Sequence, residues 1–250
     1  MRSMGVRFRS IITLAIFNGY IPMRNNISWV VAFALSPISY IFLLVMIGRY
    51  EMISYGFVGG LVMAMSASSY GLIGDIIWYR INLKLQDLFL ATPAPSWAYI
   101  LGLSLSAYVW ASPSLAGFIL IGYVIGVLRD ITILGIIIAL TTVLWINTAS
   151  TAFLLSTFIR SEKYVWPLSS ILGLVLSVFP PVYYPLTILP KEIWFVALTP
   201  PTASTAFLIE VYTGMISVDL IYVVYAVLNL MLQTIVFALL FIRRSKIIEW

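Results

Sequence analysis

The side chains that could do chemistry in this sequence are few, and two reactive types are missing altogether. The sequence contains no Cys and no His. Their absence excludes disulfides, thiol catalysis, haem ligation through His and most zinc sites, and it removes the usual proton shuttle. No two carboxylates lie inside the apolar runs to share acid and base roles. We therefore expect a protein that is not an enzyme and that binds no cofactor or metal itself.

One carboxylate and three amide side chains lie well inside the long apolar runs. Asp75 is the one carboxylate clearly within such a run, and a lone acid there is a functional candidate by default. Its position one turn before Arg80, near the end of the run, favours contact with water instead. Asn147, Asn229 and Gln233 lie deeper. Amides in hydrocarbon usually bond other helices, and a substrate path is the alternative that stays open for all three.

The sequence has no phosphate-binding loop. Such a loop needs a Lys followed by Ser or Thr, but the four lysines precede Leu85, Tyr164, Glu192 and Ile247. Any ATP-derived energy would therefore have to come from a partner.

These residues are embedded in a chain that is 62% hydrophobic and only 9% charged. Soluble domains carry about 45–50% apolar and about 25% charged residues, so the composition predicts an all-α integral membrane protein. Apolar runs long enough for about 20 residues of spanning helix predict six spans, at residues 28–48, 55–79, 97–127, 132–159, 164–179 and 218–242. The third run is too long for a straight helix and contains Pro113, so we expect tilt or a kink.

The distribution of Lys and Arg predicts the orientation. With the N-terminus in the cytoplasm, the inside segments hold 11 of the 14 Lys and Arg residues and the outside segments hold 3. This asymmetry predicts a multi-pass protein of the cell membrane with both termini cytoplasmic. It also explains the net charge of +5 without a nucleic-acid partner.

Two segments outside the spans are also apolar. Residues 1–26 place Arg2, Arg7 and Arg9 before a short apolar run with no small-x-small cleavage site. We expect a helix at the cytoplasmic interface, with a cleaved signal peptide as the alternative.

Residues 180–215 hold repeated Pro and two apolar pieces too short to span. We expect a re-entrant hairpin in the outer leaflet, with an amphipathic external loop as the alternative.

We predict a helix in the segment 80–93, between the second and third spans. On a helical wheel one face is apolar and one stripe is charged, while two leucines, Leu83 and Leu90, point away from the apolar face. The apolar face holds Ile81, Leu85, Leu88 and Phe89, and the charged stripe holds Arg80, Lys84 and Asp87. A helix that packs on the membrane domain and docks a partner would use both faces, whereas the alternative helix only lies in the lipid interface.

The second span carries small residues at every fourth position, namely Gly56, Gly60, Ala64 and Ser68. Such a stripe lets helix backbones approach closely. Packing inside the bundle is the first interpretation, and a subunit interface or a substrate-lining wall is the second.

Three motifs resemble those of the ABC type-2 permeases, the membrane subunits of export-type ABC transporters. Residues 82–93 resemble the family's acidic, leucine-rich segment that ends in Pro. Val182-Tyr183-Tyr184-Pro185 with Leu189-Pro190 is similar to its aromatic-Pro and Leu-Pro signature, and Thr199-Pro200-Pro201-Thr202 stands where relatives show Asn-Pro. Relatives often carry Glu-Arg-Glu-x-Gly before the leucine-rich segment, whereas this chain has Trp78–Lys84 there, which changes the expected details of ATPase docking.

The resemblance implies two permease chains, identical or paralogous, in membrane lipid with two ABC ATPase subunits that bind ATP and Mg. It implies outward transport of a lipid, glycan, drug or other amphiphile by alternating access. The implied coupling residues are Arg80, Leu83, Lys84, Asp87 and Leu90, and the implied outer gate is Pro180, Pro181, Tyr183, Tyr184 and Pro185.

A self-sufficient secondary transporter or channel is the rival function. Proton-coupled carriers usually need ionisable groups near the midplane, and the sequence shows none there and no evident inverted repeat.

Overall fold

A computed structural model describes residues 2–92, 94–159, 163 and 165–247. Within these ranges every regular element is a helix, which confirms the all-α prediction. Four of the described helical segments are long and apolar enough to cross a membrane: Tyr50–Ile81, Ser96–Val124, Ile131–Phe158 and Leu220–Arg243. They match four of the six predicted spans to within a few residues.

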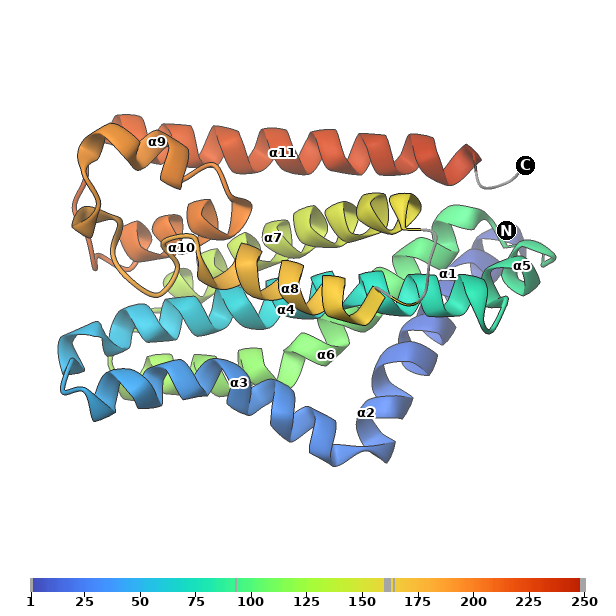
Figure 1. Cartoon of the computed structure of the whole chain (residues 1–250), viewed down its shortest axis with the longest axis horizontal. Coiled ribbons are helices and arrows are strands. Elements are labelled where there is room, and N and C mark those ends of the chain that lie inside the picture. Colours follow the sequence, from blue (N-terminus) through green and yellow to red (C-terminus); the bar gives the residue numbers. More distant parts are fainter. Residues whose placement is uncertain (1, 93, 160–162, 164, 248–250) are drawn as a thin grey trace.

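The helices of the bundle run side by side along the longest axis of the molecule, as Figure 1 shows. They are α3 (Ile27–Met46), α4 (Ile53–Ile81), α6 (Ser96–Val124), α7 (Ile131–Phe158), α8 (Val165–Val178) and α11 (Leu220–Ile247). The central helix is α4, which packs against α3, α6, α7 and α8. Its side chains are buried over most of its length, whereas α11 exposes a row of large apolar side chains that includes Leu228, Leu232 and Leu239. An apolar row without a protein partner is the face that lipid would cover.

The α6 helix is continuous through Pro113, and its ribbon changes direction near the middle (Figure 1), as expected for a Pro that removes one backbone donor. It ends at Val124, three residues before the predicted end of that span. Gly126 adopts a left-handed conformation with φ +74°, and the amides of Val127 and Leu128 bond back to the carbonyl of Gly122 at 3.0 Å. This turn terminates the helix because glycine enters the left-handed region without strain.

The N-terminal segment forms α1 (Arg2–Ala15), a π-helical turn (Ile16–Tyr20) and α2 (Ile21–Asn25). The helix α1 lies closely against α6, since a Cβ added to Gly102 would stand 2.6 Å from Cβ of Leu14. The predicted helix over residues 1–26 is therefore divided by the π-turn. Such turns occur frequently at functional sites.

The fifth predicted span ends at Val178, where α8 ends, and Pro180, Pro181 and Pro185 follow within a non-helical segment. The predicted break is confirmed, because these Pro residues cannot donate the bonds that would continue the helix. The chain then forms two short 3₁₀ turns (Leu186–Ile188 and Lys191–Ile193), α9 (Trp194–Ala197) and α10 (Pro201–Tyr212). Figure 1 shows α9 and α10 at one end of the bundle, and α1, α5 (Leu85–Leu90) and the last turns of α11 at the other.

Candidate functional site

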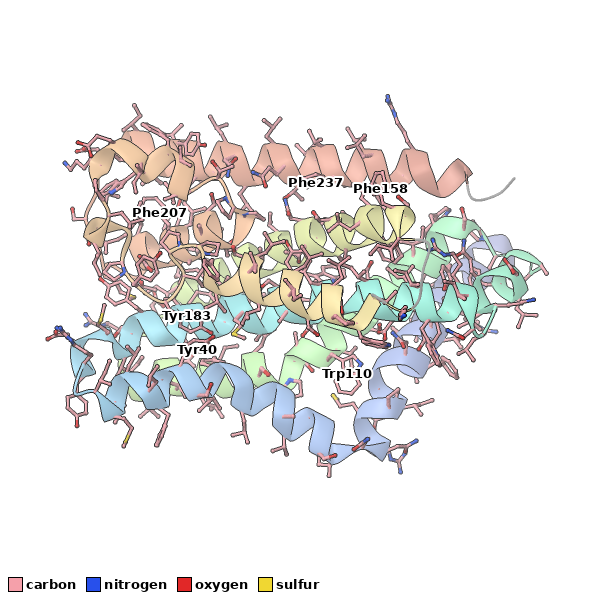
Figure 2. The ribbon with its side chains drawn as sticks, in the orientation of Figure 1. Tyr40, Trp110, Phe158, Tyr183, Phe207 and Phe237 are labelled. Carbon is pink, nitrogen blue, oxygen red and sulfur yellow. The ribbon has the colours of Figure 1, made fainter. Side chains whose placement is uncertain are left out.

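A cavity of about 530 Å³ lies between α2, α4, α6 and α8, in the half of the bundle nearer to α5. Its lining includes Asn18, Ser68, Asp75, Tyr79, Trp110 and Trp166. Figure 2 shows Trp110 on α6, close to the space beside α2. Most of the lining surface is apolar, and its polar groups are the Asp75 carboxylate, the hydroxyls of Ser68 and Tyr79, and the amides of Asn18, Asn25 and Asn26. Apolar surface with a small number of polar groups is the usual composition of a small-molecule site.

Asn18 is the centre of the polar network in this cavity. Its side-chain nitrogen Nδ2 donates to Oγ of Ser106 at 2.7 Å and to Oδ2 of Asp75 at 3.3 Å. The hydroxyl of Tyr79 donates to Oδ1 of Asn18, and the indole nitrogen of Trp110 donates to the backbone oxygen of Asn18 at 3.1 Å. The π-turn places this buried amide between α4 and α6, so the turn determines the geometry of the network.

Asp75 bonds an amide in the cavity and has no cationic partner among the described residues. The nearest cation along the helix, Arg80, points elsewhere: its guanidinium donates to the carbonyl oxygens of Ile159 at 2.7 Å and Ser156 at 3.3 Å, at the end of α7. The one ion pair within the described ranges joins Arg49 and Glu51, in the connection between α3 and α4. The Asp75 carboxylate is therefore held by a neutral donor alone.

The predicted coupling segment is not one helix from Arg80 onward, and that prediction was wrong. The α4 helix continues to Ile81, and α5 begins only at Leu85. Between them Lys84, the N-cap residue of α5, adopts a left-handed conformation with φ +47°, so the chain changes direction before α5 begins. A single helical wheel therefore cannot describe Leu83 together with α5.

The exposure of the coupling residues follows from this break. Leu83 lies in the turn and is 49% exposed, and Leu88 is 63% exposed, although Leu88 was predicted to face the membrane domain. Phe89 is the residue of α5 that packs inward, with its ring 5.3 Å from that of Tyr99 on α6. Lys84 and Asp87 are exposed. The side chain of Leu90 lies outside what the structure describes.

The predicted outer-gate segment folds back onto the start of α4. The ring of Tyr183 stacks on that of Tyr40 in α3, with centroids 4.4 Å apart, and its hydroxyl contacts Sδ of Met63 at 3.0 Å. Figure 2 shows this pair of rings between α3 and α4. A Cβ on Gly59 would stand 2.4 Å from the Tyr183 ring, so α4 has no room there for a larger residue. Burial, and secondarily Tyr40, raises the pKa of the Tyr183 hydroxyl, which therefore stays neutral.

The other outer-gate residues surround Tyr183 at the same end of the molecule. Pro181 and Pro185 are buried, whereas Pro180 and Tyr184 are partly exposed. The hydroxyl of Tyr184 lies 3.4 Å from the carbonyl oxygen of Phe179. The segment is not helical, and it packs on α3 and α4 through the ring of Tyr183.

The two amides of α11 bond the end of α9 and the start of α10. Asn229 Nδ2 donates to the carbonyls of Leu198 and Thr199, both at 3.0 Å, and contacts Oγ of Ser204 at 3.1 Å. Gln233 donates to Thr199 at 2.7 Å and to Oδ1 of Asn229 at 2.9 Å. They satisfy carbonyls that a short helix leaves without partners.

Asn147 lies elsewhere in the bundle, fully buried on α7. Its Nδ2 donates to Oγ1 of Thr234 on α11 at 3.2 Å, and its Oδ1 has no hydrogen-bond partner among the described residues. None of the three amides lines the cavity around Asp75.

Sequence reasoning singled out Asp75 but missed Asn18, Ser106, Trp110 and Trp166. Asn18 is separated from Asp75 by 57 residues and from Ser106 by 88. The one local signal was the polar Asn18-Gly19 pair that interrupts an apolar run.

No protein-family model matches this sequence, and no curated protein matches it either.

Proposed function

We propose that this chain is the permease subunit of an ATP-driven exporter of the ABC type-2 class. The observation that supports the proposal is the placement of two family-like motifs at opposite ends of α4. The segment with α5 follows the last turn of α4 and exposes Leu83 and Leu88, while the Pro-broken segment packs through Tyr183 on the first turns of α4. One rigid, buried helix thus connects a surface for a partner to a candidate gate.

In this proposal α3 and α8 cross the membrane together with the four longer spans. The N-terminal helices α1 and α2 lie at the cytoplasmic interface, both termini are cytoplasmic, and α9 and α10 form the hairpin in the outer leaflet of the cell membrane. The apolar row on α11 supports this placement, and so does the position of α1, α5 and the last turns of α11 at one end of the bundle (Figure 1).

The proposed mechanism is the alternating access that the family resemblance implies, and the missing phosphate loop assigns ATP binding to a partner. A separate ATPase pair binds ATP and Mg, closes, and moves α5 of each permease chain. Because α4 continues from this region to the contact with Tyr183, its displacement would open the aromatic closure between Tyr40 and Tyr183. Two permease chains, identical or paralogous, would enclose the path between them.

The cargo in this proposal is an amphiphile that enters from the inner half of the membrane. The cavity around Asp75 lies in that half and has a volume of about 530 Å³, which is within the range of sites for drug-sized ligands. Its mixed lining suits a molecule with an apolar body and one polar end.

The decisive experiment is purification of the chain in mild detergent from its native membrane, followed by reconstitution with whatever ATPase accompanies it. We expect an ATPase of about 25–35 kDa, roughly one nucleotide-binding domain, and transport that requires ATP. Transport by the chain alone, driven by a proton or sodium gradient, would overturn the proposal in favour of a secondary transporter.

A further inference from the structure

The cavity around Asp75 combines one carboxylate with two indole side chains, and this combination favours a positively charged ligand. A carboxylate removed from bulk water is costly unless it is paired. The pairing inside the protein is incomplete, because the amide of Asn18 is neutral and Arg80 is engaged with the end of α7. An incoming cation would supply the missing charge.

The tryptophans give the site its aromatic walls. The indole nitrogen of Trp110 is fixed on the backbone of Asn18 at 3.1 Å, which sets the orientation of the ring. Trp166 on α8 lies against Gly74, since a Cβ on that glycine would be 2.7 Å from Cζ3 of the ring. The neighbouring residue of Gly74 is Asp75, so an indole and the carboxylate line adjacent parts of the same wall. Indole faces attract cations through their quadrupole.

The size and composition of the cavity argue against an anion and against a bare metal ion. No Lys or Arg is among its described lining residues, so the one charged side chain that an anion would meet there is the Asp75 carboxylate. Within the described part of the chain no cluster of acidic side chains could hold a metal ion. A volume of about 530 Å³ is far larger than a single ion needs, and a Cβ on Gly71 would point into open space.

We propose that this cavity binds a lipophilic organic cation, with Asp75 as its counter-ion and Trp110 and Trp166 as its aromatic walls. The inference rests on the proposed export function only in naming the cation as cargo, since binding requires the permease chain alone. An organic cation has both an apolar body that fills the cavity and a charge that pairs with Asp75.

The test is equilibrium dialysis of tetraphenylphosphonium against the purified full chain in detergent micelles without ATPase, with empty micelles as the blank. We expect saturable binding to the unmodified chain and binding that is weaker by about tenfold or more in Asp75→Asn, because a desolvated charge pair is lost. Asp130→Asn, which changes an exposed carboxylate at the start of α7, should bind like the parent. Tetraphenylborate has the same shape and the opposite charge, and it should not bind saturably.

Two further variants keep the test informative if Asp75→Asn unfolds. Gly71→Phe should fill the open space and abolish binding, and Trp166→Leu, at a half-exposed position, should weaken it severalfold. Equal binding to the parent chain and to Asp75→Asn, or equal binding of tetraphenylborate, would overturn the inference. Saturable cation binding by a chain with which no ATPase copurifies from its native membrane would contradict the export proposal alone, whereas ATP-driven transport with no cation binding would contradict this inference alone.

Discussion

The ring of Phe118 lies directly over Gly60. A Cβ added to this glycine of α4 would stand 2.1 Å from Cε1 and 2.2 Å from Cζ of the ring, and Phe118 on α6 is fully buried. The same stripe of small residues meets α3 at Gly56, where a Cβ would be 2.9 Å from Cγ1 of Ile41. At these two positions the small residues of α4 permit close packing of helices within one chain.

Gly60→Ala should therefore destabilise the protein. The methyl group would force the Phe118 ring or the α6 backbone to move, and overpacking of this kind costs about 1–3 kcal/mol. Gly71→Ala, on the same helix, should be neutral or slightly stabilising, because its Cβ meets nothing within 4 Å and Ala is the better helix former. Thermal unfolding of the two variants in the same detergent measures the difference. Equal melting temperatures would show that α4 and α6 are not packed at this distance.

Asn229→Leu tests whether this amide serves structure or transport. The substitution removes one donor from each of the Leu198 and Thr199 carbonyls, while Ser204 and Gln233 still donate to them. We expect a loss of about 0.5–1.5 kcal/mol in the free energy of unfolding, together with faster proteolysis of the segment around α9. Leu228→Ala, at an exposed neighbouring position on α11, serves as the control. A stable Asn229→Leu protein that has lost transport would assign the amide to the substrate path instead.

Glu210 should make stability depend on pH. This residue of the short, non-spanning helix α10 is 1% exposed, and its Oε1 lacks a hydrogen-bond partner among the described residues. Burial raises the pKa of the Glu210 carboxyl well above its ordinary value of 4.5. The unfolded chain therefore loses this proton first as pH rises, so stability is greatest at low pH and falls as pH increases above about 4.5 toward the folded-state pKa.

The measurement is the melting temperature between pH 4 and pH 8, a range chosen to begin near the ordinary pKa of glutamate. Glu210→Gln should remove the part of the pH dependence that comes from this residue, because the amide is neutral throughout. Asp219→Asn, at an exposed position before α11, should keep the full pH dependence of the unmodified protein. If the melting temperatures of the unmodified protein and of Glu210→Gln depend on pH in the same way, the Glu210 carboxylate is paired or hydrated in the folded protein.

The periodicity of the sequence predicted where the helices lie, but it did not predict the contacts between them. Apolar runs located the second span at 55–79, where α4 covers Ile53–Ile81, and the Pro cluster located the break after Val178. Both are local signals. The left-handed Lys84 carries no such signal, because Lys rarely adopts that conformation, so the turn between α4 and α5 was missed. The Asn18 network was missed because its members come from distant parts of the chain.

We predict that the proposed ATPase docks on the exposed leucines of the turn and of α5. Leu83 and Leu88 are largely exposed, and the inward face of α5 is occupied by Phe89 against Tyr99. A fully buried leucine is worth about 1.5–3 kcal/mol, so each one that enters a partner groove should contribute about tenfold or more to affinity. Leu83→Asp and Leu88→Asp should each reduce the amount of ATPase that copurifies with the permease, because an unpaired carboxylate in a closed groove is costly.

The yield and the melting temperature of these two permease variants should stay normal, since neither side chain is buried in the isolated chain. Transport should be lost while the basal hydrolysis of the partner persists. Phe89→Asp should behave differently, because it removes the contact with Tyr99 and should lower the yield of the permease itself. If both leucine variants retain full ATPase association and transport, the docking surface is elsewhere. Residues 160–163, which the sequence places in the second cytoplasmic loop, would be the next segment to mutate.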